Sequence, residues 1–140
     1  MINIENKVTD TVIRAMRTEY PKAIVEDRYN GSPAGFPFVA IYEMSNTIPH
    51  QYVDNCENEL YANIAYEVQI FTNDKLKKAT AKAIADFIDG IMRGMGFNRT
   101  FYNPIPNIDR TIYRIAIRYQ AIVRKGIETG ENETTYLLYQ

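Results

Sequence analysis

The stretch TIYRIAIRYQAIV, from Thr111 to Val123, alternates in side-chain character more cleanly than any other part of the chain. Successive side chains of a strand point to opposite faces of a sheet, so this alternation predicts a long strand. The positions of one set are Tyr113, Ile115, Ile117, Tyr119, Ala121 and Val123. The positions of the other set are Ile112, Arg114, Ala116, Arg118, Gln120 and Ile122.

Two upstream stretches alternate in the same way. Leu60–Thr72 predicts a second long strand, with one core face and one mixed face on which Glu67 is expected to be solvated. Phe36–Met44 is apolar at both sets of positions, which favours a strand in the centre of its sheet. Shorter strands are predicted at Ala23–Asp27 and Phe97–Tyr102, and the prolines in Asn103–Asp109 predict a turn.

Helical periodicity appears in two places. Ile4–Glu19 has an apolar stripe at helical spacing, with Asn3 as its expected N-cap and Pro21 beyond its end. A second helix is expected to start at a cap on Asn73 or Asp74 and to continue to about Arg93. Its apolar stripe comprises Leu76, Ala79, Ala83, Ile84, Phe87, Ile88 and Ile91.

The order of these elements predicts an α+β fold, in which two main helices pack on one face of an antiparallel or mixed β-sheet. We expect residues 1–140 to form a single domain with its core between about 4 and 123. The tail, 125–140, is polar, and Thr134–Tyr139 can add an edge strand. Ser45–Glu59 is expected to be a long loop.

Composition excludes several classes of protein. The chain has 140 residues, 46% of them apolar and 24% charged, as in an ordinary globular domain. A net charge of −1 argues against a general nucleic-acid or membrane binder that relies on bulk positive charge. The only cysteine, Cys56, excludes an intramolecular disulfide. The N-terminal sequence lacks the pattern of a secretory signal, and no apolar run is long enough to span a bilayer.

Chemistry-bearing motifs are scarce. His50 and Cys56 are six residues apart in an acidic segment, which is a poor match to a metal site, and no cofactor motif is present. The glycine clusters do not follow a strand and open a helix, as a phosphate cradle requires. We therefore expect no catalytic residue, no metal and no cofactor, and a protein that is not an enzyme. A small metal-dependent nuclease would have to use Asp54, Glu57, Glu59 and Glu67.

Charges are segregated along the chain. The stretch from Glu43 to Glu59 carries acidic residues and no Lys or Arg, whereas the stretch from Arg110 to Lys125 carries only basic ones. One interpretation is a solvated sheet face beside solvated loops. Another is complementarity between subunits, and contact of the basic strand with DNA phosphates is a third. The candidate interface residues are Glu43, Asp54, Glu57, Glu59, Arg110, Arg114 and Arg118.

Specific strings resemble a known family. The stretch MGFNRTFYNPIPNID, Met95 to Asp109, followed by Thr111–Arg114 and Arg118-Tyr119, resembles the C-terminal half of small tail-terminator proteins of long-tailed bacteriophages and prophages. These are also described as tail-completion, head–tail joining or minor capsid proteins. FPFVAIYEM, from Phe36, and YEVQIFTN, from Tyr66, are similar upstream.

The resemblance implies a structural protein of the virion tail, assembled in the cytoplasm of the bacterial host. Members form a ring, commonly a hexamer, at the head-proximal end of the tail tube. The ring ends tube polymerisation and offers a surface to head-completion or connector proteins, while DNA passes through its lumen. The expected partners are thus further copies of this chain, the tail tube protein and a head-completion protein, with no membrane. Another head–tail connector or adaptor protein, a small nuclease and a small-molecule-binding module remain as alternatives.

Overall fold

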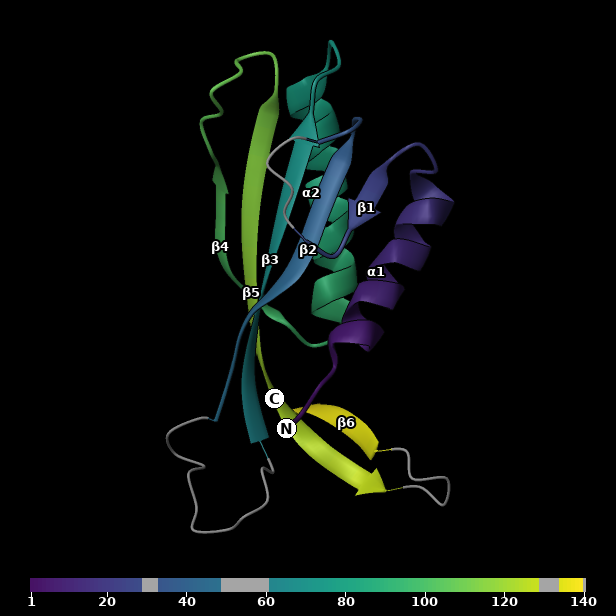
Figure 1. The fold of residues 1–140 in the computed structure, drawn as a ribbon, viewed down its shortest axis with the longest axis vertical. Coiled ribbons are helices and arrows are strands. Elements are labelled where there is room, and N and C mark those ends of the chain that lie inside the picture. Colours follow the sequence, from purple (N-terminus) through teal and green to yellow (C-terminus); the bar gives the residue numbers. More distant parts are fainter. Residues whose placement is uncertain (29–32, 49–60, 129–133, 140) are drawn as a thin grey trace.

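The computed structural model describes residues 1–28, 33–48, 61–128 and 134–139, and side chains up to Arg124. Two helices and six strands follow one another along these residues (Figure 1). In chain order they are α1 (Glu5–Glu19), β1 (Ile24–Glu26), β2 (Phe38–Thr47), β3 (Tyr61–Thr72), α2 (Lys77–Gly94), β4 (Asn98–Pro104), β5 (Tyr113–Glu128) and β6 (Thr134–Tyr139).

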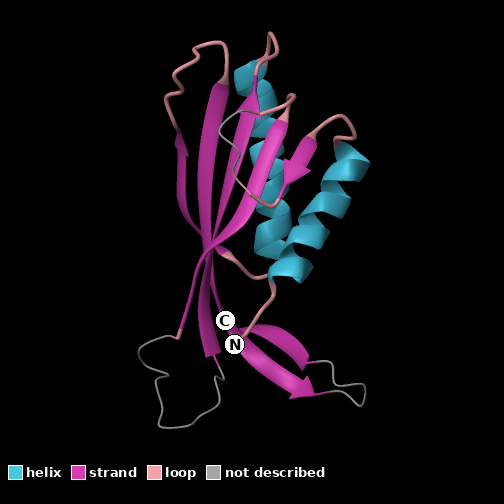
Figure 2. Cartoon of the chain, in the orientation of Figure 1, coloured by secondary structure: helices cyan, strands magenta, loops and turns pink. Residues whose placement is uncertain are grey.

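The strands form one mixed sheet in the order β1-β2-β3-β5-β4, and β6 pairs with β5 outside this path. Only β1 and β2 run parallel; the other pairs are antiparallel. Both helices lie on the same side of the sheet, as Figure 2 shows. The predicted α+β class, with two helices on one face of a largely antiparallel sheet, is therefore confirmed.

The core between the sheet and the helices follows the predicted alternation. Val39 and Ile41 of β2 face the helices, whereas Phe38 and Ala40 face the other way. The helices contribute their own apolar stripes, which comprise Val8, Val12 and Met16 of α1 and Ala81, Ile84, Ala85, Ile88 and Met92 of α2. Each fully buried aliphatic side chain contributes about 1.5–3 kcal/mol, so this layer dominates the stability of the fold.

Three boundaries differ from the sequence prediction. β2 continues beyond Met44 to Thr47, because a bulge between Glu43 and Ser45 lets the strand go on pairing with β3. The expected loop thus starts later, and residues 49–59 of it lie outside the described residues. β5 extends past Val123 to Glu128, where it pairs with β6, so the optional edge strand at Thr134–Tyr139 is present.

The starts of both helices also correct the prediction. The cap position of α1 is Ile4, although the Asn3 side chain accepts the Glu5 N–H at 3.1 Å. α2 begins at Lys77 with Leu76 as its cap position, so neither Asn73 nor Asp74 occupies that place. Because Leu76 precedes the helix, it leaves the predicted apolar stripe and is 71% exposed.

β4 includes Pro104, which the sequence had assigned to a turn. A proline is tolerated there because β4 is an edge strand, paired on one side only within the described sheet. The next residue, Ile105, donates its N–H to the carbonyl of Arg114 at 3.0 Å, so pairing with the start of β5 continues past the proline.

The sheet face away from the helices has a smaller cluster of its own. Phe38, Ala40 and Phe71 are buried there, and their rims are covered by half-buried Ile24, Phe36, Tyr42 and Ile112. The Phe38 and Phe71 rings meet edge to face with their centroids 5.9 Å apart. No helix within the described residues is long and apolar enough to cross a membrane.

Candidate interface on the helix-free sheet face

The structure separates the residues predicted for an interface. Arg114 and Arg118 lie on β5 and share the helix-free face, and Arg110 is exposed in the turn before that strand. Glu43 lies on the opposite face, because its partner across the β2–β3 ladder is Tyr66 of the helix-side core. Asp54, Glu57 and Glu59, like His50 and Cys56, lie outside the described residues.

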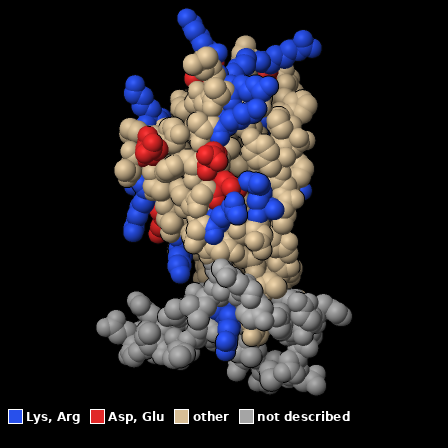
Figure 3. Space-filling model, turned by 180° about the vertical axis from the view of Figure 1, so that it is seen from behind, with Lys and Arg blue, Asp and Glu red and all other residues tan. Residues whose placement is uncertain are grey.

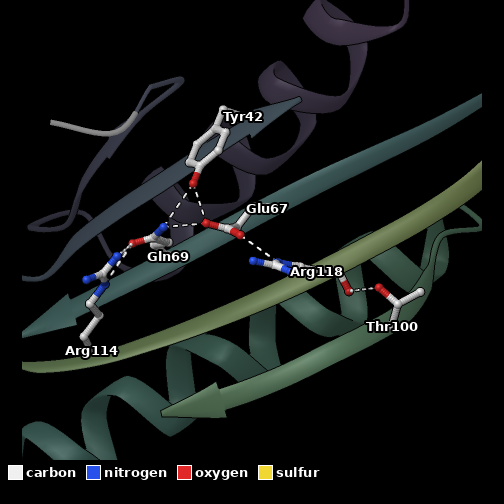
Figure 4. A network of polar contacts seen from close by, with 6 residues as sticks. All are labelled: Tyr42, Glu67, Gln69, Thr100, Arg114 and Arg118. Atoms are coloured by element: carbon white, nitrogen blue, oxygen red, sulfur yellow. Dashed lines mark hydrogen bonds and ion pairs between the residues drawn. The ribbon is translucent and has the colours of Figure 1, made fainter. Parts of the chain in front are cut away.

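Arg114 and Arg118 belong to a polar network that spans three strands (Figure 4). Tyr42 donates its hydroxyl to Glu67, and Gln69 donates to both of them. Arg118 Nε lies 2.9 Å from Glu67 Oε2. Arg114 donates from Nε and Nη2 to Gln69 Oε1, at 2.9 and 2.6 Å.

Strand register explains why these side chains meet. Tyr42, Glu67 and Arg118 occupy one rung across β2, β3 and β5. The rung of Gln69 is flanked by two alanines, Ala40 and Ala116, whose small side chains leave room for the neighbouring tyrosine and arginine to lean over it. The side chains of Tyr42, Arg114 and Arg118 thereby cover Glu67 and Gln69 at the centre of the network.

Glu67 corrects the sequence prediction, because it is only 6% exposed rather than solvated. Burial alone would raise the pKa of its carboxyl. Hydrogen bonds from Tyr42, Gln69 and Arg118, together with the Arg118 charge, outweigh burial and lower that pKa below its ordinary value. Burial and the bond to Glu67 raise the pKa of Tyr42 to about 12. At neutral pH the network therefore holds an ionised carboxylate, a protonated phenol and two guanidinium groups.

Arg118 remains available to a partner despite its bond to Glu67. Its side chain is 49% exposed, whereas that of Glu67 is 8% exposed. The guanidinium lies over the ring of Phe101, 5.0 Å from its centroid, and that ring is itself 37% exposed. Arg114 lies in the same manner over Phe71, at 5.3 Å. The result is a rigid patch in which a cation and an aromatic ring face solvent together.

Sequence reasoning missed Tyr42, Gln69 and Phe101 as members of this site. A signal for part of it was present, since the mixed face of Leu60–Thr72 places Glu67 and Gln69 two residues apart. Arg114 and Arg118 are four residues apart on a strand of the opposite direction. Polar pairs at even spacing on two predicted strands indicate that the strands are neighbours with their polar faces aligned.

A second polar cluster fastens α2 to the sheet on the other face. Tyr119 donates its hydroxyl to Asp89 Oδ1 at 2.8 Å, and Arg99 Nη1 lies 3.0 Å from Asp89 Oδ2. A groove of about 370 Å³ runs beside it, lined by Lys82, Ala85, Asp86, Asp89, Arg99 and Tyr102. Both oxygens of Asp89 are occupied within the chain, so the cluster acts first as a structural link.

No protein-family model matches the chain, and no curated protein matches its sequence. Within the part of the chain that the structure describes, no three His, Cys, Asp or Glu side chains come together in a group that could hold a metal ion.

Proposed function

We propose that this chain is a structural subunit of a phage or prophage tail. Copies of it would form a ring at the head-proximal end of the tail tube, end tube polymerisation and provide the surface that joins the head. The resemblance of Met95–Asp109 and of the β2 and β3 sequences to tail-terminator proteins supports this proposal. Its expected partners are the tail tube protein, a head-completion protein and further copies of the chain.

The observation that carries the proposal is the pairing of Arg118 with Phe101 on a sheet face that neither described helix covers. Arginine and aromatic residues are enriched in protein interfaces. Arg118 is already immobilised by Glu67, so it loses little side-chain entropy when a second protein binds. A surface built in this way favours protein contact over solvation.

The alternatives receive less support. The nuclease hypothesis assigned Glu67 to a metal site, but both of its carboxylate oxygens accept hydrogen bonds from side chains of the same protein. No observation here favours the nuclease over a structural role. Another connector or adaptor of the head–tail junction would present the same kind of face, and the position of the protein in the virion distinguishes it from a terminator.

The test is the mass of the protein in solution, by analytical ultracentrifugation, together with negative-stain images of the particles and of tails. We expect rings in the wild type. Phe101→Ser should raise the concentration at which they dissociate by at least about tenfold, as for one hot-spot residue. Tyr102→Ser is the matched control, because Tyr102 is the next residue of β4, is 42% exposed and faces the other side of the sheet.

Two results would contradict the proposal. Equal weakening by both variants would show that the helix-free face has no special part in assembly. A wild-type protein that stays monomeric at every concentration, and that is absent from the ends of tail tubes, would remove the ring itself. Circular dichroism and urea unfolding of both variants must match the wild type for either comparison to count.

A further inference from the structure

Two buried oxygen atoms on the helix side of the sheet, Glu43 Oε1 and the Tyr66 hydroxyl, have no hydrogen-bond partner among the described residues. Tyr66 is fully buried, and its ring packs edge to face on Phe97 with the centroids 5.6 Å apart. Glu43 and Tyr66 are direct partners across the β2–β3 ladder, so their side chains enter the same layer. Buried polar groups of native proteins are nearly always satisfied, so this pair needs a partner that the described residues do not supply.

A second carboxylate lies at the same place. Glu5 is the first residue of α1, and the segment before this helix is fixed to β2 by Asn46, whose Nδ2 donates to the Ile2 carbonyl at 2.7 Å. Burial and the charge of Glu5 raise the pKa of Glu43, and burial and the charges of both glutamates raise the pKa of Tyr66. We call Glu5, Glu43 and Tyr66 the oxygen cluster; its members come from three elements and meet under the first turn of α1.

No positive side chain neutralises the oxygen cluster within the part of the chain that the structure describes. Neither carboxylate forms an ion pair with a lysine or arginine there. Lys7 is close to Glu5 in sequence, but residues two apart on a helix do not face each other. In Figure 3 the Lys and Arg side chains gather toward the upper end of the molecule, whereas the first turn of α1 is at the lower end of that helix (Figure 1). The two carboxylates therefore repel each other when both are ionised.

The arrangement of Glu43 and Tyr66 fits a shared cation better than a shared proton. Tyr42 and Glu67, the same two residue types on the neighbouring rung, are joined by a direct hydrogen bond. Tyr66 and Glu43 Oε1 lie side by side without one. Oxygens that share a Ca²⁺ ion each lie about 2.3–2.6 Å from it, so they are farther apart than two hydrogen-bonded oxygens.

The chemistry of the oxygen cluster also favours a cation over a water molecule. A bridging water satisfies the hydroxyl but leaves the repulsion between Glu5 and Glu43 in place, whereas a cation removes both problems. The raised pKa of Tyr66 keeps its hydroxyl protonated at neutral pH, and that oxygen still offers lone pairs. Two carboxylates and a neutral oxygen form an all-oxygen set, which hard cations such as Mg²⁺ and Ca²⁺ prefer.

We propose that Glu5, Glu43 and Tyr66 bind one hard divalent cation, Mg²⁺ or Ca²⁺, with water at its remaining positions. Glu5 is exposed, so the outer side of the site is open to those waters and to entry of the ion. The Tyr66 hydroxyl is the third protein ligand, and the site therefore differs from a group of three His, Cys, Asp or Glu side chains. The proposal departs from the sequence prediction of no metal and is independent of the proposed assembly.

The bound ion joins the start of α1 to the middle of β2 and β3. It replaces the repulsion between Glu5 and Glu43 by attraction of both to one charge. Because the first turn of a helix opens more readily than its middle, the ion acts most strongly on the amides there. One of these is the Val8 N–H, which donates to the Ile4 carbonyl at 3.0 Å.

Titration of the protein with CaCl2 or MgCl2, after treatment with a chelator, tests the site. We expect calorimetry to show one ion per chain, and thermal unfolding to shift upward with ion concentration. Glu43→Gln keeps the side-chain volume, relieves the repulsion by Glu5 and should raise the dissociation constant at least about tenfold. Glu19→Gln is the matched control, since it removes the same charge from an exposed position at the other end of α1 and should bind as the wild type does.

Terbium luminescence tests the tyrosine ligand. Tb³⁺ takes the same oxygen ligands as Ca²⁺ and emits when a nearby excited aromatic ring passes energy to it. The chain has no tryptophan, so tyrosine must be the donor. Tyr66→Phe should lose most of the emission and bind Ca²⁺ more weakly, whereas Tyr20→Phe, at the far end of α1, should keep both. Equal emission from the two variants would overturn the assignment of Tyr66 as a ligand.

Hydrogen exchange locates the effect of the ion. CaCl2 should slow exchange of the Val8 amide in the wild type and leave it unchanged in Glu43→Gln, with NaCl of equal ionic strength as the reference. Three results would overturn the proposal. They are no binding of either ion up to about 10 mM, tenfold above the weakest Ca²⁺ sites of proteins, equal weakening by Glu43→Gln and Glu19→Gln, and equal protection by NaCl. The first would identify water as the partner of the buried oxygens, and the others a diffuse ion atmosphere.

Discussion

Two neighbouring rungs of the β2–β3 ladder hold the same two residue types in opposite order. Tyr42 faces Glu67, and Glu43 faces Tyr66. Strand alternation puts the first pair on the helix-free face and the second under the helices. On the open face the hydroxyl donates to the carboxylate. Under the helices the Tyr66 hydroxyl and Glu43 Oε1 are buried, and neither has a hydrogen-bond partner among the described residues.

The two tyrosine–glutamate pairs differ because of the side chains beside them, rather than because of the pairs themselves. Glu67 has Gln69 and Arg118 beside it, and their donors keep it ionised. Among the described residues Glu43 has no such donor; burial and the like charge of Glu5 on α1 raise its pKa. An acid in the first turn suits the dipole of α1, so Glu5 favours its own helix while it opposes Glu43. A buried carboxylate is therefore stabilised only where the sheet also places its donors.

The largest change in stability should come from the Tyr42–Glu67 rung, where the carboxylate accepts hydrogen bonds from its neighbours. Glu67→Ala leaves the Tyr42 hydroxyl without its acceptor, removes one of the two acceptors of the Gln69 amide and leaves Arg118 without its counter-ion. We expect a loss of about 2–3 kcal/mol in the free energy of unfolding, measured by urea denaturation. Glu67→Gln is the control, since it keeps an acceptor and the volume and should lose less. Equal losses would mean that the charge, rather than the hydrogen bonds, holds the network.

Removing the hydroxyl should change stability in different directions at the two tyrosines. Tyr42→Phe removes a hydroxyl that donates to an ionised carboxylate, so it should cost about 1–2 kcal/mol. Tyr66→Phe removes a buried hydroxyl that has no partner within the described chain, so it should be neutral or stabilise the fold by about 1 kcal/mol. Thermal unfolding of both variants beside the wild type measures this. A destabilised Tyr66→Phe would reveal a bond, to bound water for instance, on the helix side.

Period-two alternation was enough to predict which of these side chains share a face of the sheet. It placed Val39, Ile41 and Glu43 together and opposite Phe38 and Ala40, as observed. What it could not predict is the state of the carboxylates. That depends on the register between strands, which brings Arg118 beside Glu67 across 51 positions of sequence. Local sequence does not show that Tyr42, Gln69 and Arg118 surround this carboxylate, so it left Glu67 wrongly assigned to solvent.

The ends of helices and strands could be predicted where the local sequence carries a strong stop signal. Pro21 lies beyond the end of α1, and the helix stops at Glu19 as expected. The bulge that extends β2 to Thr47 depends on pairing with β3 and has no local signature. The start of α2 at Lys77 was missed for a similar reason, since Asp74 bonds to Thr80 in a turn rather than at the cap position. Pairing with β3 therefore decided the end of β2, and a local turn decided the start of α2.

The smallest effect, and the most specific, is in the dependence on pH. Because the pKa of Glu43 is raised in the fold, its protonated form stabilises the protein below about pH 4.5, its ordinary value, and this contribution is lost as the pH rises through the raised value. The lowered pKa of Glu67 acts oppositely: its contribution is present above about pH 4.5 and is lost as the pH falls through the lowered value. Glu43→Gln should therefore raise stability near neutral pH by about 0.5 kcal/mol, the size of one like-charge contact, and change it little at pH 4. Glu67→Gln should lower the free energy of unfolding at neutral pH. It should also make that free energy fall less as the pH drops. Urea unfolding from pH 3 to pH 8 measures both, and parallel curves for the two variants would mean that the two faces of the sheet do not differ in how they hold a carboxylate.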